Sequence, residues 1–500
     1  MLSEKTGGIK IFRFRKAKKP RYDEASANIE KQAVPSRVRE CEKLIKDIFN
    51  NSSDLVVNIF TTHSETAMIV FIDGLVNKDL IDRDIIKPIK SPGFDGDVAL
   101  AVQTIFEKTE DMSVVVEQVL TGNVAVFYEK SNQAYIVEFK GYDKRTVSQP
   151  DAEAVIRGPK ESFTENIQTN TALMRRKIKT PKFIMESMTL GRQTKTSVIL
   201  TYIDGIVNQE VLAELKRRLS KIDTAEILET GQIEQQICEN TFLPISGMGL
   251  TQKPDTAAQK VLCGKIAILC DGTPHALIIP DLFIENLHTS EDYYNRTVYT
   301  SIIRILRTIS LLITILLPGL GVAIITFHAE MIPAVFFTSI INASQKVPMP
   351  IAMEVLMLAA VFELVQVGGA RLPNTVGSAI TIVGSLVIGE AAVSAGIVSR
   401  TMVIIVALTA VAGFLTPNLH EFTIIYRLFF WLLGSTMGLI GIGAGVFIMM
   451  TQLISTYTFG IPILSSFSKE ELKNSIIRFP IKSLKDRPES IVKDNIKKQR

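Results

Sequence analysis

The sequence predicts an α/β soluble N-terminal region of two duplicated subdomains, followed by an α-helical membrane domain that crosses the bilayer several times. Two observations predict this fold class. The chain contains 55 basic and 51 acidic residues, yet only nine charged residues lie in 308–468, and no soluble core needs uncharged runs as long as 308–327 or 428–468. In addition, two sequence segments recur in the same order before residue 300. A wholly soluble globule is therefore excluded.

The net charge of +4 is distributed unevenly along the chain. The first 21 residues carry +7 and the last 32 carry +5, whereas residues 22–307 carry −7. Nucleic-acid binding would require a basic patch with aromatic platforms, and residues 10–21 have only Phe12 and Phe14 nearby. We therefore interpret 1–40 as a basic, disordered arm and 467–500 as a basic cytoplasmic tail, and we expect no nucleic-acid partner.

Cysteine and histidine usage argues against a metalloenzyme. The four cysteines show neither a CxxC motif nor metal-ligand spacing, which is typical of a reducing compartment, and the five histidines are scattered. No apolar segment follows the basic N-terminus, so we expect no secretory signal. No nucleophile–base pair or phosphate loop is present either, and the sequence therefore predicts neither an enzyme, a metal site nor a cofactor.

The soluble half contains an internal duplication. Residues 67–77 recur at 198–208, and 119–137 recur at 261–279. Each copy is interpreted as a strand, an Asp-Gly turn, helices and a hairpin, and we assign 41–150 to the first copy and 191–300 to the second. Asp73-Gly74 and Asp204-Gly205 are interpreted as strand-ending turns rather than as ligand carboxylates, because Asp tolerates and Gly supplies the unusual backbone angles of a turn.

Residues 151–190 connect the two copies. Gly158-Pro159 followed by charged residues is typical of a helix start, since proline fits the first turn of a helix. A helix over 160–178 would place four side chains on one face, namely Phe163, Ile167, Thr171 and Met174. On physical grounds alone this segment is a bridging helix whose charges are solvated.

The transmembrane domain is expected to cover 301–466, with four to six spans. The segment 308–327, with twenty uncharged residues, is the clearest candidate for a span. The segment 331–344 is too short to cross and is interpreted as re-entrant or interfacial. Further spans are expected at 350–368, 372–389, 401–419 and twice within 428–468, with a break near 438–445. The basic residues at both chain ends favour cytoplasmic termini and an even number of spans.

Two features indicate an ion or solute path. Glu354, Glu363 and Glu390 lie at membrane depth, where a carboxylate is costly unless it faces protein or water. The segment 375–396 is rich in small residues, and one helical face carries Ser378, Thr381, Ser385 and Ile388. Both features have a structural alternative, since the glutamates could lie at helix ends and small residues often serve close helix packing. A pore lining is the more specific hypothesis.

Several separated motifs are similar to those of one family. They are RGPKESFTE (157–165), TNTALMRRKIK (169–179), PDLF (280–283), EDYYNR (291–296), FHAEMIP (327–333), ARLPNTVGSAITIVGSLVIGEAAVSAGIVS (370–399) and TPNLHEF (416–422). In this order the motifs resemble the A subunit of the GerA-type spore germinant receptors, over about residues 40–480. The signature residues in the connecting segment are Arg157, Gly158, Pro159, Glu161, Phe163, Glu165, Asn170, Arg175 and Arg176.

The resemblance implies a multi-pass protein of the spore inner membrane. Such A subunits work with a B-type multi-spanning subunit, thought to bind the nutrient, and a C-type lipoprotein subunit. They are thought to oligomerise into a ring and to form a ligand-gated cation channel that triggers germination. Two alternatives stay open: a paralogous spore membrane protein associated with dipicolinate and ion release, and a secondary transporter, although transporters usually repeat their membrane halves.

Overall fold

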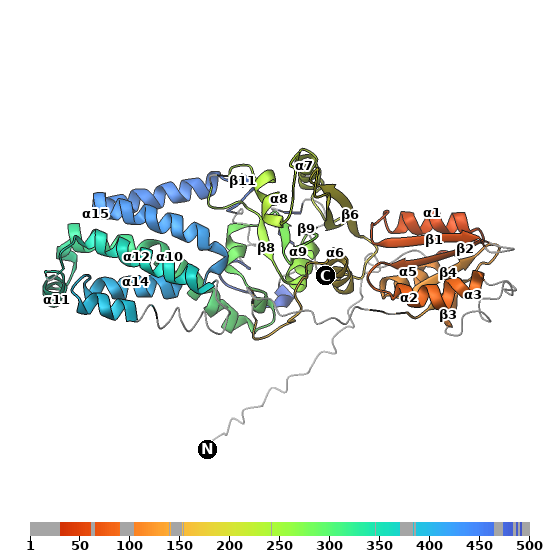
Figure 1. Cartoon of the computed structure of the whole chain (residues 1–500), viewed down its shortest axis with the longest axis horizontal. Coiled ribbons are helices and arrows are strands. Elements are labelled where there is room, and N and C mark those ends of the chain that lie inside the picture. The colour runs from red at the N-terminus through yellow and green to blue at the C-terminus, as the bar shows by residue number, and fades with distance from the viewer. Residues whose placement is uncertain are drawn as a thin grey trace, which may run out of the picture.

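The computed structural model describes residues 31–61, 66–90, 105–139, 141, 153, 155–241, 243–345, 347–370, 384, 387–464, 474–483, 487–488 and 491–492. Two α/β units and a helical bundle follow one another along the longest axis of the molecule (Figure 1). The predicted fold class is confirmed.

The first α/β unit is an antiparallel sheet of five strands in the order β1-β2-β4-β5-β3. The alternating side chains of β2 contribute to two separate cores, one against α1 and α5 and the other against the α2–η2–α3 segment. Because both faces are covered, the strand is apolar at nearly every position. The elements are α1 (Val38–Ile48), β1 (Leu55–Thr61), β2 (Thr66–Ile72), α2 (Lys78–Ile81), η2 (Asp82–Ile86), α3 (Lys87–Lys90), β3 (Ile105–Thr109), α5 (Met112–Leu120), β4 (Val124–Tyr128) and β5 (Ala134–Val137).

The second unit repeats this topology, with strand order β6-β7-β9-β10-β8. Helices α7 and α8 cover one face of the sheet, and α6 and α9 cover the other. Gly74 and Gly205 have φ angles of 78° and 76°, so both Asp-Gly pairs form the predicted turns. The elements are β6 (Phe183–Leu190), β7 (Thr196–Ile203), α7 (Gln209–Leu219), α8 (Thr230–Ile237), β8 (Gly249–Thr251), α9 (Pro254–Leu262), β9 (Ile266–Cys270) and β10 (Ala276–Ile279).

The boundaries of the units differ from those expected from the sequence. Val34, inside the expected arm, is buried in the first core, so that unit begins before residue 41. Strand β6 pairs with β7 along its whole length, and the second sheet therefore includes residues 183–190 of the expected connection.

The bridging helix is shorter than predicted. Helix α6 (Ile167–Lys177) begins after Asn166, whose side chain accepts hydrogen bonds from the backbone N–H groups of Gln168 and Thr169. Residues 157–166 are not helical. The backbone N–H of Phe163 donates instead to the carbonyl of Gln252, which holds this stretch against the second unit. The helix therefore starts at the Asn166 cap, eight residues after Gly158, and not at the Gly-Pro pair.

Three helices of the described chain are long and apolar enough to cross a membrane, over Thr297–Phe327, Ile351–Gly369 and Pro417–Ser455. Two shorter apolar helices accompany them (Figure 1). The helices of this region are α10 (Thr297–Phe327), α11 (Ala334–Ser344), α12 (Ile351–Ala370), α14 (Arg400–Gly413) and α15 (His420–Ser455).

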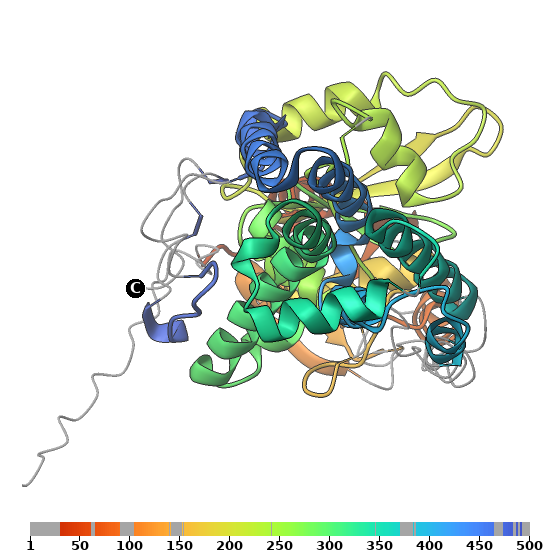
Figure 2. The ribbon, with the colours of Figure 1, turned by 90° about the vertical axis from the view of Figure 1, so that its left-hand side faces the viewer.

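Helix α15 folds back on itself at Gly438. This residue has a φ of 62° and a ψ of −142°, which are not helical angles and which glycine adopts readily. It lies within the break predicted near 438–445. The Tyr426 hydroxyl lies 2.6 Å from Gln452 Oε1, although a straight helix would hold two residues so far apart in sequence almost 40 Å apart. The two halves of α15 are therefore antiparallel, and Figure 2 views the bundle from its far end.

Glycines allow α10 to approach the first half of α15 closely. A Cβ atom at Gly319 would lie 2.4 Å from the carbonyl oxygen of Phe430, and one at Gly434 would lie 2.4 Å from the carbonyl oxygen of Gly319. The helices thus meet backbone to backbone, as small residues allow in membrane bundles.

The chain returns from the bundle to the second α/β unit. The short strands β11 (Tyr457–Thr458) and β12 (Ile461–Pro462) follow α15, and Phe459 between them is buried in the core of that unit. Ile491 and Val492 are buried in the same core. The expected solvated tail is therefore partly packed, and the chain leaves the bundle at the end where α10 enters it.

Candidate functional site

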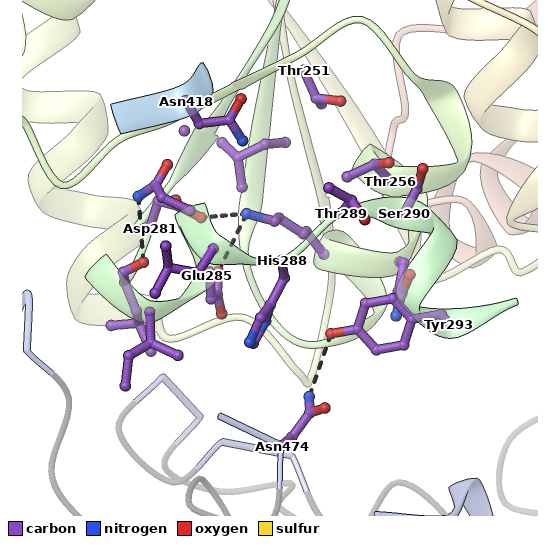
Figure 3. Close-up of a pocket in the computed structure, with 18 of the residues that line it drawn as sticks. Thr251, Thr256, Asp281, Glu285, His288, Thr289, Ser290, Tyr293, Asn418 and Asn474 are labelled. Carbon is purple, nitrogen blue, oxygen red and sulfur yellow. Dashed lines mark hydrogen bonds and ion pairs between the residues drawn. The ribbon is translucent and has the colours of Figure 1, made fainter. Parts of the chain in front are cut away.

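A cavity of about 560 Å³ lies where the second α/β unit meets the helical bundle. Its walls come from β8, α9 and β10, from residues 281–294, from α10, from the connection between α14 and α15, and from residues 474–475, 481 and 487–488 (Figure 3). Its size falls within the range of small-molecule sites. We call it the junction cavity.

Two lysines and two carboxylates form an ion network in the wall of the junction cavity. Lys260 and Lys265 both bind Asp281 and Glu285, with Lys265 Nζ 3.2 Å from Asp281 Oδ1 and Lys260 Nζ 3.2 Å from Glu285 Oε2. Although burial opposes it, the two ammonium groups hold the pKa of Asp281 well below its usual range, whereas burial raises the pKa of Glu285. The network contains two ammonium groups and two carboxylates, so each lysine already has a carboxylate partner.

Asp292 connects the second unit to the start of α10. Its carboxylate lies 2.9 Å from Arg304 Nε and 3.0 Å from Arg307 Nη1, and all three side chains are buried. Asp292 also completes a capping box with Thr289. The guanidinium of Arg478, from the C-terminal segment, donates to the backbone carbonyls of Asp292 and Asn295. One carboxylate therefore fixes the chain at the point where it enters the bundle.

The junction brings together motifs that are far apart in the sequence. The backbone N–H of Arg157 donates to Glu291 Oε1 at 3.2 Å. Gly158 has a φ of 135°, and a Cβ there would lie 2.8 Å from the ring of Tyr294. Pro417 and Asn418 line the cavity from the connection before α15. Segments of the RGPKESFTE, PDLF, EDYYNR and TPNLHEF motifs thus meet in one place.

A second contact between distant residues joins the two α/β units. Arg175 Nε lies 2.7 Å from Asp54 Oδ2, and Arg175 Nη2 lies 2.8 Å from Asp54 Oδ1. Arg175 also donates to Ser52 Oγ and to the Thr180 carbonyl, and its side chain is fully buried. Such a two-pronged pair is the strongest form of this ion pair. Arg175 therefore binds the first unit to the second.

The other signature residues of the connecting segment have local contacts. The side chain of Asn170 pairs with both the N–H and the carbonyl of Thr164, at 2.8 and 2.6 Å. Arg176 lies 3.4 Å from Glu161 in a partly exposed pair. Phe163 is buried in the core beside α6, and the carbonyl of Glu165 accepts from Gly272 N–H. These residues shape the connection between the units.

The membrane candidates that the structure describes are not gathered in one site. Glu354 is fully buried and accepts a hydrogen bond of 2.7 Å from the backbone N–H of Ser399, just before α14. Glu363 lies 2.7 Å from Arg427 and 3.2 Å from His420. Both therefore connect helices within the chain. Ile388 and Glu390 are exposed, and Ser378, Thr381 and Ser385 lie outside the described residues.

Comparison with known proteins identifies the family. The family model "Bacillus/Clostridium GerA spore germination protein" matches residues 43–490. The chain belongs to the GerA family. The resemblance drawn from the motifs is thus confirmed, and this is not a known enzyme family.

The GerA-family chain is similar to named spore germination proteins over most of its length. It is 37% identical to "Spore germination protein KA" of Bacillus subtilis (strain 168), over 92% of this chain and 88% of the relative. It is 36% identical to "Spore germination protein GerLA" of Bacillus cereus, over 90% and 94%. The "Uncharacterized membrane protein YfkQ" of Bacillus subtilis (strain 168) is 36% identical, over 85% and 86%.

A solved structure also matches the N-terminal α/β region. It is the N-terminal domain of the A subunit of the Bacillus megaterium spore germinant receptor GerK3, with 32% identity and a TM-score of 0.40, and the match covers 51% of this chain and 98% of that chain.

His288 makes the junction of this GerA-family chain sensitive to acid. Burial, reinforced by the positive charge of Arg304, lowers the pKa of His288 well below its ordinary value of 6.5, and its Nε2 donates to the carbonyl of Ser475 at 2.8 Å. The folded protein keeps the ring neutral while the unfolded chain protonates it below pH 6.5. His288 should therefore reduce stability as the pH falls below 6.5, by up to about 1.4 kcal/mol per pH unit.

Thermal unfolding of the purified protein between pH 7.5 and pH 5 measures this effect. His288→Gln keeps a donor for Ser475 but cannot titrate, so its melting temperature should fall less steeply with acid than that of the wild type. If the melting temperature falls equally steeply with pH in the two proteins, His288 is not held neutral.

Proposed function

We propose that this chain is the A subunit of a nutrient germinant receptor in the spore inner membrane, with cytoplasmic N- and C-termini. The observation that carries the proposal is the match to the GerA family over residues 43–490, together with the convergence of its motifs at the junction cavity. The soluble units and the segment after α15 lie at one end of the bundle, which agrees with an even number of spans.

The chain would act in a complex with a B-type multi-spanning subunit and a C-type lipoprotein. Several copies would form a ring around a cation path that opens when a nutrient binds to the partner subunit. Such a ligand shifts the equilibrium only if it binds the closed and open states differently. The Asp292 cluster supports this role, because any displacement of the second unit would pull directly on α10.

The pore residues remain part of this proposal. Ser378, Thr381, Ser385 and Ile388 would line the path, and the exposed carboxylate of Glu390 would attract cations. Glu354 and Glu363 already bind protein groups within the chain, so their first contribution is to position α12 against α14 and α15.

Bulky substitutions in the small-residue segment test the proposal. Thr381→Leu and Ser385→Leu should alter nutrient-triggered release of monovalent cations from spores by several-fold, while the receptor complex still assembles. Ile404→Phe is the matched control, because Ile404 is an exposed side chain of α14 and should leave ion release unchanged.

Ion release and assembly are measured together, by cation efflux from spores and by co-purification of the partner subunits. If both leucine variants assemble and release cations as the wild type does, the segment does not line the pore. Cation flux through the purified protein in vesicles, without a solute gradient, distinguishes a channel from a transporter.

A further inference from the structure

The first half of α10 has an apolar face that no described part of the chain covers. Arg304 and Arg307 point into the protein toward Asp292, so the charged side of the helix is the buried one. The opposite side is apolar, and Val298 is 74% exposed. The exposed apolar residues of this half are Val298, Tyr299, Ile302, Ile305, Leu306 and Ile309.

The C-terminal segment extends this face. Residues 474–483 run beside α10, where the Ser301 hydroxyl accepts from the backbone N–H of Arg478 at 3.1 Å and Arg304 Nη1 donates to the Asn474 carbonyl at 2.7 Å. The guanidinium of Arg478 points inward and is only 2% exposed. The apolar side chains around it are exposed instead, namely Ile476, Ile477, Phe479 and Ile481.

Two segments almost 180 residues apart thus present exposed apolar side chains on one flank of the junction. We call these ten residues the junction face. Their backbone is fixed by the inward-facing arginines, so the apolar side chains cannot turn into the protein without breaking buried ion pairs. A contiguous exposed apolar patch of this kind normally marks a surface that another phase or molecule covers.

We propose that the junction face docks into the boundary between headgroups and acyl chains of an anionic bilayer. The exposed apolar side of α10 runs on to Leu312, and the whole helix Thr297–Phe327 is long and apolar enough to cross a membrane, so the junction face and the span meet the same lipid. Tyr299 is an aromatic residue of the kind enriched at membrane interfaces, and Phe479 is of the kind found on the buried side of interfacial segments. Arg296 and Lys482, exposed at the edge of the face, suit anionic headgroups.

This inference rests on the membrane location in the proposed function but goes beyond it. It places the C-terminal segment in the interface, held between lipid and α10, rather than in solution. The Asp292 cluster then lies directly behind the headgroup layer, and the bilayer surface contacts the residues that join the second unit to the bundle.

Lipid-quenching fluorescence of the full-length protein tests the docking. An environment-sensitive fluorescent amino acid replaces Ile477 or Phe479, and the protein is reconstituted in phosphatidylcholine–phosphatidylglycerol vesicles, with lipids brominated at a shallow acyl position. Phe447, which is 73% exposed on α15, is the positive control for insertion, and Leu228, exposed in the second unit, is the aqueous control.

The expected result is strong quenching by brominated lipid at residues 477 and 479, close to that at 447, with little quenching at 228. Iodide in the water should show the reverse order. Iodide quenching at 477 and 479 equal to that at 228 would overturn the proposal, and protection from both quenchers would assign the face to a second protein copy instead. Loss of lipid quenching at 447 would count against membrane insertion itself, and hence against the proposed function.

Discussion

Arg175→Met should lower the free energy of unfolding of the soluble region by about 3–5 kcal/mol, because it leaves the buried carboxylate of Asp54 without its counter-charge. Both side chains are almost completely buried, and Arg175 supplies both prongs of the pair as well as the bond to Ser52. The contact is a buried ion pair between the two units, which also share hydrogen bonds of the Met185 backbone with Ser52 and Ser53. We therefore expect a lower melting temperature and faster proteolysis of residues 157–182.

Arg176→Met is the matched control, since it removes the same type of side chain from the next position. Its pair with Glu161 is partly exposed and should contribute at most about 1 kcal/mol. The double variant Arg175→Met with Asp54→Leu should recover part of the loss, because no charge is then left buried. Similar melting temperatures for the two single variants would contradict the assigned role of Arg175.

Asp292→Asn should cost a similar amount, about 3–5 kcal/mol, at the junction with the bundle. The amide keeps the shape of the side chain but leaves Arg304 and Arg307 buried without a carboxylate. We expect a lower melting temperature in detergent and faster hydrogen exchange in the first turns of α10, where the arginines hold the helix to the second unit.

Asp223→Asn provides the control for this change. Asp223 pairs with Arg192 at 3.2 Å, but both side chains are largely exposed, so the same substitution should alter stability by less than about 1 kcal/mol. If Asp292→Asn behaves like Asp223→Asn, the buried cluster does not hold α10 in place.

Much of the fold was predictable from local patterns. The apolar runs of β2 and β7 and the hairpins that follow α5 and α9 are strong signals, because these strands are buried on both faces. The first strand of each unit was missed. β1 lies at the edge of its sheet and includes the exposed residues Asn58 and Ile59, so it lacks the continuous apolar character of the inner strands.

The candidate site was predictable only in part, because its contacts are non-local. Arg175 stood out as a signature residue, but its partner Asp54 lies 121 positions away, and no spacing rule connects them. The same holds for Asp292, Arg304 and Arg478, which meet from three separate segments. Glu354 was singled out from the sequence as a carboxylate that needs a partner, yet its hydrogen bond to Ser399 depends on how α12 packs beside α14.

The return of the chain into the second α/β unit has a consequence for the order of biosynthesis. Phe459, Ile461, Ile491 and Val492 complete a core whose other side chains come almost entirely from residues 184–282. The ribosome makes these four residues only after every helix of the bundle has been translated. The second α/β unit therefore obtains its last core side chains only after the whole bundle has been synthesised, and a chain stalled in translation before residue 459 carries an unfinished hydrophobic core.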